Sequence, residues 1–182
     1  MLYLGFAAFA LLFLGDWNDW RLKKNWLRHC FFMGVALFVI STVGLCIGHK
    51  PVMPAIFRIL FGILALIFGA LTLYTVLSVA WKTNKNDEKK VYTGEFYALC
   101  RHPGILYFIP LYLCLWLTCG FPVYAAVAFS ALDLLLGVFE DKVVFPAFLD
   151  GYDQYKSEVP FLIPTRSSFQ RFLCNKCKDE TL

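Results

Sequence analysis

The sequence predicts an all-α polytopic membrane protein with about five transmembrane helices. Of its 182 residues, 59% are hydrophobic and only 16% are charged, and the mean hydropathy is +0.62. Such a chain is too apolar for a soluble domain, because several long apolar segments would compete for one core. The segments are continuous rather than alternating, so helices rather than barrel strands are expected to satisfy the backbone in a bilayer. We expect a single membrane domain over residues 1–182.

Five apolar segments predict the membrane spans. The first is short for a bilayer that needs about 20 helical residues, and a cleaved signal peptide is the alternative interpretation. It has no basic N-terminal region and no convincing small-residue cleavage site, which favours a retained, shallow helix. The predicted spans are Leu2–Leu14, Phe31–Ile47, Ile56–Val79, Ile105–Cys119 and Phe121–Phe139.

The basic residues predict the orientation of these spans. Lys and Arg gather in 21–28, in the long hydrophilic connection 82–101 and in 142–178, whereas the loop between the second and third spans contains only Lys50. Cytoplasmic loops carry this excess, so we expect the N-terminus outside and the C-terminus in the cytoplasm of a cell membrane, or of the endoplasmic reticulum if the source is eukaryotic. The net charge of +4 therefore indicates topology, and no nucleic-acid partner is expected.

The chain beyond the fifth span is expected to pack against the bundle. Pro146 should interrupt the helix, and Ala147–Glu158 should form a short amphipathic helix. Val159–Pro164 should be extended, because each proline restricts itself and the residue before it. An apolar extended segment needs a packing surface, so we expect it to fold back over the cytosolic mouth of the bundle. Residues 165–182 are expected to be a cytosolic tail.

Seven cysteines do not suggest a disulfide framework. Five lie in or beside predicted spans, where apolar packing is their ordinary role. Cys174 and Cys177 form one CxxC motif in the tail. Without a second pair this motif is a weak zinc signal, and no metal site is expected.

Two polar clusters should meet at one membrane boundary. Arg101-His102-Pro103 precedes the fourth span, and Glu140-Asp141 follows the fifth, at nearly equal distances from the tight turn Cys119–Pro122. A helical hairpin therefore brings both to the same end. Pro103 suits a first helical position, where the following free amides and the helix dipole favour an anion. Arg101 and His102 add a fixed positive charge and a tunable proton donor or acceptor, and Glu140 adds a negative charge.

Aromatic residues lie near both clusters in the sequence. A ligand with a carboxylate, a cationic centre and a flat base would match the combined set, and S-adenosylmethionine has all three. Taken singly, each part has an ordinary alternative: a positive flank, solvated surface charges or interfacial tyrosines. Only their joint placement favours a site. The aromatic residues are Tyr92, Phe96, Tyr97, Tyr152 and Tyr155.

A longer pattern of motifs covers residues 92–164. In chain order it comprises Thr93-Gly94-Glu95-Phe96-Tyr97, Arg101-His102-Pro103, Glu140, Tyr152, Tyr155, Val159-Pro160 and Ile163-Pro164. This segment resembles the isoprenylcysteine carboxyl methyltransferase-like family, which also includes phospholipid N-methyltransferases. The resemblance implies an S-adenosylmethionine-dependent methyltransferase that binds its cofactor between the last two spans and the C-terminal segment. The cofactor-binding residues that it implies are Tyr97, His102, Pro103, Glu140, Tyr155, Pro160 and Leu162.

Two departures from the family pattern leave the methyl acceptor open. The family often continues Arg-His-Pro-x-Tyr-x-Gly, whereas Ile105 and Tyr107 stand at the last two defined positions here. The paired glutamates of the carboxyl methyltransferases are here Glu140-Asp141. We expect a lipid-like or small hydrophobic acceptor that carries a carboxylate, thiol or amine and reaches the site through the bilayer. Methyl transfer depends mainly on alignment in a dry site. The expected catalytic residues are Arg101, His102 and Glu140, the last two assisting if an ammonium must lose a proton.

Asp133 is a separate candidate, for binding the substrate. It lies in the fifth span, two turns before Glu140 and on the same helical face. A charged aspartate at such depth costs roughly 2.5–3.5 kcal/mol on insertion scales, so it should face the protein interior or a wet cavity. It either makes an interhelical hydrogen bond, for example to Thr72, Tyr74 or Thr75, or orients the acceptor.

Two other functions remain possible from the sequence. One is an NADPH-dependent membrane reductase of related helical fold, although such chains are generally longer and no site for an adenosine 2′-phosphate is evident. The other is a non-catalytic membrane scaffold or small transporter. The sequence does not indicate an oligomeric state.

Overall fold

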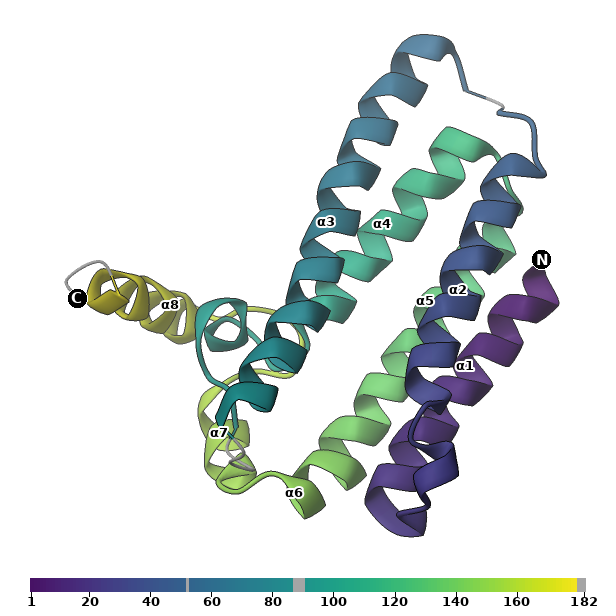
Figure 1. The fold of residues 1–182 in the computed structure, drawn as a ribbon. Helices are drawn as coiled ribbons and strands as arrows, with labels where there is room; N and C mark the ends of the chain where they lie inside the picture. The colour runs from purple at the N-terminus through teal and green to yellow at the C-terminus, as the bar shows by residue number, and fades with distance from the viewer. Residues whose placement is uncertain (52, 87–90, 180–182) are drawn as a thin grey trace.

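The computed structural model describes residues 1–51, 53–86 and 91–179, with side chains omitted for 79–86 and 174–179. The described chain is all-helical, as predicted (Figure 1). Short turns connect or extend the main helices: η1 (Asn18–Leu22), η2 (Asn25–Leu27), η3 (Glu95–Ala98) and η4 (Glu140–Val144). The helices are α1 (Leu2–Trp17), α2 (Cys30–Ile47), α3 (Ala55–Asn86), α4 (Pro103–Cys119), α5 (Val123–Phe139), α6 (Phe145–Phe148), α7 (Tyr152–Glu158) and α8 (Arg166–Asp179).

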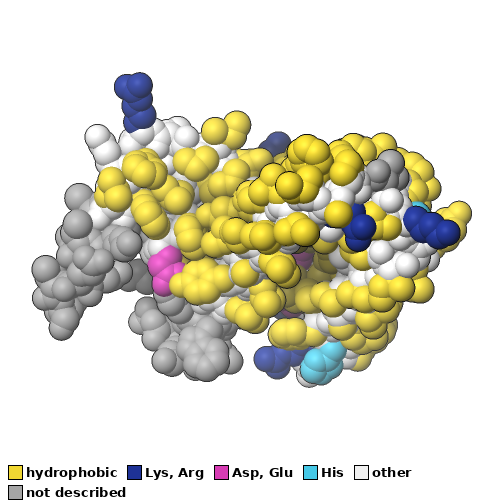
Figure 2. Space-filling view, turned by 90° about the horizontal axis from the view of Figure 1, so that it is seen from above, with side chains coloured by type: hydrophobic (Ala, Val, Ile, Leu, Met, Phe, Trp, Pro, Cys, Tyr) yellow, Lys and Arg dark blue, Asp and Glu magenta, His cyan; other side chains and the backbone are white. Residues whose placement is uncertain are grey.

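The length and apolar composition of the helices indicate a membrane protein. Within the described ranges, three helical stretches are long and apolar enough to cross a bilayer, namely Asn25–Ile47, Ala55–Ser78 and Val123–Phe148, and Pro103–Cys119 is a shorter apolar helix. Many of their large apolar side chains point outward, such as Leu66, which is 76% exposed. Figure 2 shows hydrophobic side chains over most of the surface seen from above, with a few isolated basic groups. A lipid environment accounts for this exposure. The number of five spans and their orientation stay predictions.

The helices pack as two pairs that α5 connects. Helix α1 packs on α2, α3 packs on α4, and α5 lies against both α4 and α1 (Figure 1). Phe129 of α5 is fully buried, and its ring meets Phe9 of α1 and Phe38 of α2. The hydroxyl groups of Thr42 and Tyr112 form a hydrogen bond between α2 and α4. This aromatic core holds α4 and α5 beside the first two helices.

The turn between α4 and α5 is tight, as predicted. Gly120 follows α4 with φ +75°, and a Cβ atom there would lie 2.4 Å from the carbonyl oxygen of Lys50. Glycine is therefore required both by its left-handed conformation and by the close approach of the loop. The hairpin brings the start of α4 and the end of α5 to the same end of the bundle: a Cβ on Gly137 would touch the side chains of Ile105 and His102.

Helix α3 is longer than predicted. The sequence places the end of the span at Val79 and a hydrophilic connection from Lys82, but the helix runs on to Asn86. Hydrophilic residues mark where a span leaves the apolar region, and lysine remains a good helix former beyond that point. Residues 87–90 of the predicted connection lie outside the described part of the chain.

The chain after α5 differs from the prediction in two ways. Pro146 does not interrupt the helix, which continues through η4 to Phe148, because the π-helical turn before Pro146 already departs from the regular i→i−4 hydrogen bonds that a proline would break. The amphipathic helix α7 begins only at Tyr152, after Gly151 with φ +80°. Tyr152 and Tyr155 are buried and form the inner face of α7. The tail forms a further helix, α8, which projects sideways from the bundle (Figure 1).

Candidate functional site

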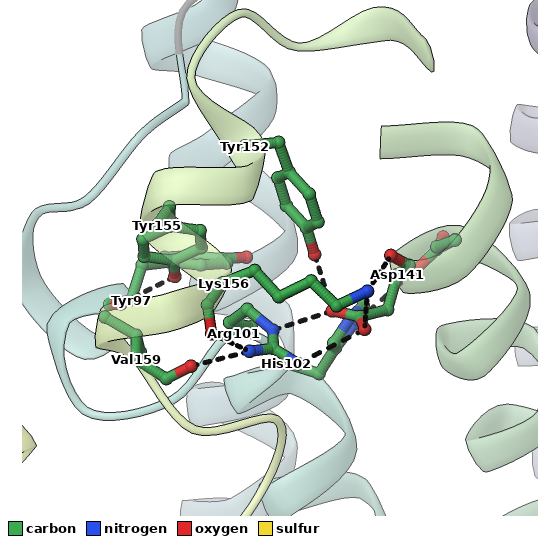
Figure 3. Close-up of polar contacts among 9 residues, drawn as sticks. Tyr97, Arg101, His102, Asp141, Tyr152, Tyr155, Lys156 and Val159 are labelled. Atoms are coloured by element: carbon green, nitrogen blue, oxygen red, sulfur yellow. Dashed lines mark hydrogen bonds and ion pairs between the residues drawn. The ribbon is translucent and has the colours of Figure 1, made fainter. Parts of the chain in front are cut away.

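Arg101 forms a buried ion pair at the start of α4. Its Nε donates to Oδ1 of Asp141 at 2.7 Å, and its Nη2 donates to Oδ2 at 3.2 Å. Its Nη1 donates to the carbonyl oxygens of Lys156 and Val159, at 2.9 and 2.7 Å (Figure 3). Such bidentate geometry is the strongest form of a carboxylate–guanidinium contact. Arg101 therefore ties η4 to α7 and to the segment that follows it.

Asp141 is the centre of this network. It also accepts a hydrogen bond from the hydroxyl of Tyr152 at 2.7 Å, and its Oδ2 lies 3.2 Å from Nζ of Lys156 (Figure 3). Burial, together with the hydrogen bond to Asp141, raises the pKa of Tyr152, so its phenol stays protonated and continues to donate. Arg101 and Glu140 are predicted to be catalytic residues of one site, but in the structure Arg101 pairs with the neighbouring acid, Asp141.

His102 lies between the two acids. Its Nδ1 is 3.6 Å from Oε2 of Glu140, and its Nε2 is 3.8 Å from Oδ1 of Asp141. The ring stacks on Phe145 at 5.8 Å and is tilted against Phe161 at 4.9 Å. His102 is only 7% exposed, and its Nε2 has no hydrogen-bond partner among the described residues. Burial keeps this nitrogen from water, and a buried polar atom without a hydrogen bond is unfavourable. The nitrogen is therefore suited to form a hydrogen bond with a ligand.

The segment after α7 runs beside the start of α4. The backbone N–H of Arg101 donates to the carbonyl oxygen of Pro160 at 2.9 Å, and that of His102 donates to Phe161 at 3.2 Å. Leu162 is half-buried and follows in the same segment. Pro103 is buried at the first position of α4, and no side chain caps that first turn.

Tyrosine hydroxyls connect α7 to α3. Tyr155 donates to the carbonyl oxygen of Tyr97 at 2.7 Å, and Tyr97 donates to that of Thr75 at 3.1 Å. Burial raises the pKa of both tyrosines, so both hydroxyls remain donors. Tyr97 and Tyr155, predicted to bind the cofactor, here orient the backbone around the site.

Asp133 is half-buried on α5, within electrostatic reach of Glu140. The expected hydrogen-bond partners on α3 donate elsewhere: Thr72 to Phe68, Thr75 to Thr72, and Tyr74 to Glu95. Helix α3 packs on α4, which explains why its hydroxyls do not donate to Asp133. The sequence allows two roles for Asp133. The first, an interhelical hydrogen bond with these residues of α3, is therefore not formed.

Three further residues of this site were not predicted from the sequence. Lys156 approaches Asp141, and no local pattern distinguishes it from other basic surface residues. Phe145 covers one face of the His102 ring. Asp16, in the last turn of α1, is 8% exposed and lies within electrostatic reach of Glu140. The only sequence signal for Asp16 is that this acid closely follows the first apolar segment.

Comparisons of the chain with protein-family models, curated proteins and solved structures gave no match. The assignment of the site therefore depends on its geometry and on the motif pattern of residues 92–164. In the part of the chain that the structure describes, no group of three His, Cys, Asp or Glu residues is placed to hold a metal ion. The side chains of Cys174 and Cys177 lie outside that part.

Proposed function

We propose that the chain is an integral membrane methyltransferase that uses S-adenosylmethionine and acts on a lipid-like or small hydrophobic acceptor. The observation that supports this most is the contact of His102 with Glu140, 3.6 Å apart where α4 begins and α5 ends. The buried His102 Nε2, without a partner among the described residues, indicates that the site is built for a ligand. In this proposal five helices cross the membrane, with the N-terminus outside and the site at the cytoplasmic boundary.

The residues present fit the three parts of this cofactor. The uncapped first turn of α4 offers free amides for a carboxylate. Glu140, whose side chain is 20% exposed, offers a carboxyl group beside which a cationic centre could bind. The rings of Phe145 and Phe161, already packed on His102, offer apolar faces for a flat base. When bound, S-adenosylmethionine would supply an electrophilic methyl group on its sulfonium.

The residues of the site have different roles in this proposal. Arg101 is a positioning residue, because its bonds to Asp141 and to two carbonyls leave it little capacity for a ligand. It holds the adjacent His102 against Glu140. His102 and Glu140 touch the ligand and can accept a proton from an acceptor group. The packed α7 segment excludes water from the reacting atoms.

A reductase is less well supported by the same geometry. Recognition of a 2′-phosphate needs a free cationic group, and Arg guanidinium is the usual one. Arg101, the arginine of this site, is paired with Asp141, whose other oxygen lies near Lys156. A scaffold without a ligand does not explain why the buried Nε2 of His102 has no hydrogen-bond partner among the residues that the structure describes.

Calorimetry on the full-length protein in lipid nanodiscs tests the proposal. We expect S-adenosylmethionine and S-adenosylhomocysteine to bind, and His102→Ala and Glu140→Gln to weaken binding by about tenfold, as for loss of one hydrogen bond to a charged group. The matched control is His49→Ala, because His49 lies in the loop at the other end of the bundle and its ring bonds to the carbonyl of Leu45. Folded wild-type protein that binds neither nucleoside, or that NADPH alone stabilises, would overturn the assignment.

A second measurement identifies the acceptor. Membranes containing the protein are incubated with methyl-labelled cofactor, and labelled lipids, peptides and small molecules are separated. We expect label in an amphiphilic fraction, reduced in membranes that contain the His102→Ala variant.

A further inference from the structure

Helix α8 is held against the rest of the protein along one side only. Its Ser168 is fully buried, and the ring of Phe172 stacks on that of Phe96 in η3 at 6.1 Å. Nη1 of Arg171 lies 3.1 Å from Oε2 of Glu158, at the end of α7. These contacts determine the direction in which α8 leaves the bundle, and they leave its opposite side open.

The open side of α8 carries large apolar side chains. Phe169 is 53% exposed and Leu173 is 48% exposed, and their spacing of four residues places them on one face of the helix. Ile163, three residues before the helix, is also exposed. Apolar side chains gathered in this way mark an interaction surface. A largely apolar hollow of about 430 Å³ adjoins this face, and its lining residues are Pro164, Thr165, Arg166, Phe169 and Gln170.

The charge of this segment indicates what the apolar face meets. Residues 159–178 contain four basic residues and no acidic residue. Arg171 is paired with Glu158, whereas Arg166 is exposed beside the hollow. Apolar side chains combined with basic ones on a short helix are typical of helices that lie in the interface of a membrane. Anionic phospholipid headgroups supply the complementary charge, and their acyl chains supply an apolar surface.

The position of α8 places it beside the bilayer that the apolar helices require. The backbone N–H of His102 donates to the carbonyl oxygen of Phe161 at 3.2 Å, so the chain enters α8 from the end of the bundle that carries the candidate site. From there α8 projects sideways, across the direction of the long helices (Figure 1). Leu66 of α3 and Leu113 of α4 are exposed on the long helices, where lipid accounts for their exposure. The surface of the same bilayer therefore extends outward from the bundle along α8.

We propose that α8 lies in the headgroup region of the membrane and binds anionic phospholipids. In this arrangement Phe169 and Leu173 insert at the boundary with the acyl chains, and Arg166 contacts a lipid phosphate. In the proposed orientation this is the cytoplasmic leaflet, which carries the anionic lipids of a cell membrane. The proposal does not depend on methyltransferase activity, and it gives residues 166–173 a role other than that of a free cytosolic tail.

Hydrogen–deuterium exchange of the full-length protein in nanodiscs tests this surface. One preparation contains phosphatidylcholine alone, and the other contains a mixture of phosphatidylcholine and phosphatidylglycerol. Exchange is measured by mass spectrometry on peptides that cover residues 166–173. We expect these amides to exchange about fivefold more slowly in the anionic mixture, as for one basic side chain near an anionic surface, because the lipid binds the helical form. High salt should remove most of this difference, because it screens the charges.

Two variants and one matched control link the protection to α8. Arg166→Gln removes the exposed charge and should abolish the difference between the two lipid preparations. Phe169→Ser removes an apolar anchor and should speed exchange in both preparations. Both side chains are exposed, so neither variant disturbs a packed core. The control is Arg58→Gln, the same change at an exposed arginine at the start of α3, and it should leave the exchange of α8 unchanged.

Three results would overturn the proposal. The first is equal exchange of residues 166–173 in the two lipid preparations. The second is an equal effect of Arg58→Gln and Arg166→Gln on that exchange. The third is protection that depends on the number of protein copies in each nanodisc and not on the lipid, which would show that a second copy of the chain covers α8.

Discussion

Nε of Arg101 lies 2.7 Å from Oδ1 of Asp141, although the two residues are 40 positions apart in the chain. The two side chains are only 8% and 5% exposed. Asp141 follows Glu140, and Arg101 precedes His102, so one ion pair determines how the candidate ligand-binding residues meet. The stability of the site should therefore depend on residues that do not themselves touch a ligand.

Replacement of Asp141 by asparagine should be strongly destabilising. Asp141→Asn leaves the Arg101 guanidinium buried without its counter-charge, and such losses cost about 3–5 kcal/mol of unfolding free energy. Unfolding of the detergent-solubilised protein by SDS titration measures this. Asp153→Asn is the control, because Asp153 is exposed in the first turn of α7. Equal unfolding of the Asp141 and Asp153 variants would contradict the central role of the ion pair.

The two buried tyrosines of α7 should differ in their contributions. Tyr152→Phe removes a hydrogen bond to the ionised Asp141 and should cost about 1.5–3 kcal/mol, whereas Tyr155→Phe removes one to a neutral carbonyl and should cost about 0.5–1.5 kcal/mol. Tyr124→Phe, on the exposed surface of α5, should change little. Thermal unfolding of the three variants under identical detergent conditions gives the order. A larger loss for Tyr155→Phe would contradict an ionised Asp141.

The protein should lose stability in alkaline solution. Burial raises the pKa of Cys100 from 9.0 to about 12, and burial also raises the pKa of Tyr97, Tyr152 and Tyr155. The unfolded chain releases these protons first, so it binds fewer protons than the folded chain. The free energy of the unfolded chain relative to the folded chain therefore falls as the pH rises, and the free energy of unfolding decreases. For Cys100 the window lies between pH 9 and about 12, with a slope of up to about 1.4 kcal/mol per pH unit.

The Cys100→Ala variant tests how much the Cys100 thiol contributes to the loss of stability at alkaline pH. The variant should lose less stability than the wild type between pH 9 and pH 11, because one of the shifted groups is gone. Urea or SDS unfolding at several pH values gives both slopes. Identical slopes would mean that Cys100 does not contribute.

Crowding at Gly137 should weaken ligand binding. A Cβ there would lie 2.2 Å from Cδ1 of Ile105 and 3.3 Å from Nδ1 of His102, so Gly137→Ala must displace one or both side chains. We expect a lower affinity for S-adenosylhomocysteine in calorimetry. Gly69→Ala is the control, since its Cβ would make only an ordinary 3.6 Å contact with Leu111. Wild-type affinity in the Gly137 variant would show that the position of His102 is not critical.

The hairpin at the centre of the site was predictable because its signals are local. Gly120 marks a tight turn, and the equal distances to His102 and Glu140 follow from counting residues along two helices. The choice of Asp141 as the partner of Arg101 was not predictable in this way. It depends on the direction in which each of two adjacent acids points and on the carbonyl groups of Lys156 and Val159, which only the folded chain brings near.

The position of Asp16 and the presence of α8 were also not predictable from the sequence. The proximity of Asp16 to Glu140 depends on the packing of α1 against η4, and no periodic pattern encodes a contact over that separation. Helix α8 is polar on average, and its composition alone does not indicate where the helix lies. The ring of its Phe172 stacks on that of Phe96 at 6.1 Å, a tertiary contact that helps to hold the helix in place.

The turn η4 has a consequence for changes in chain length. It is a π-helical turn, in which the N–H of Phe145 donates to the carbonyl oxygen of Glu140, so it contains one residue more than an α-helical path would need. Deleting a single residue after Asp141 would let the turn rewind as α-helix. Because the π-helical turn already absorbs the extra residue, the following chain would keep nearly the same rotational position, and Phe145 would stay near the ring of His102. Deleting a residue within α5 would instead rotate Glu140 and the chain after it by about 100° about the helix axis. Changes in chain length are therefore expected at η4 rather than within α5.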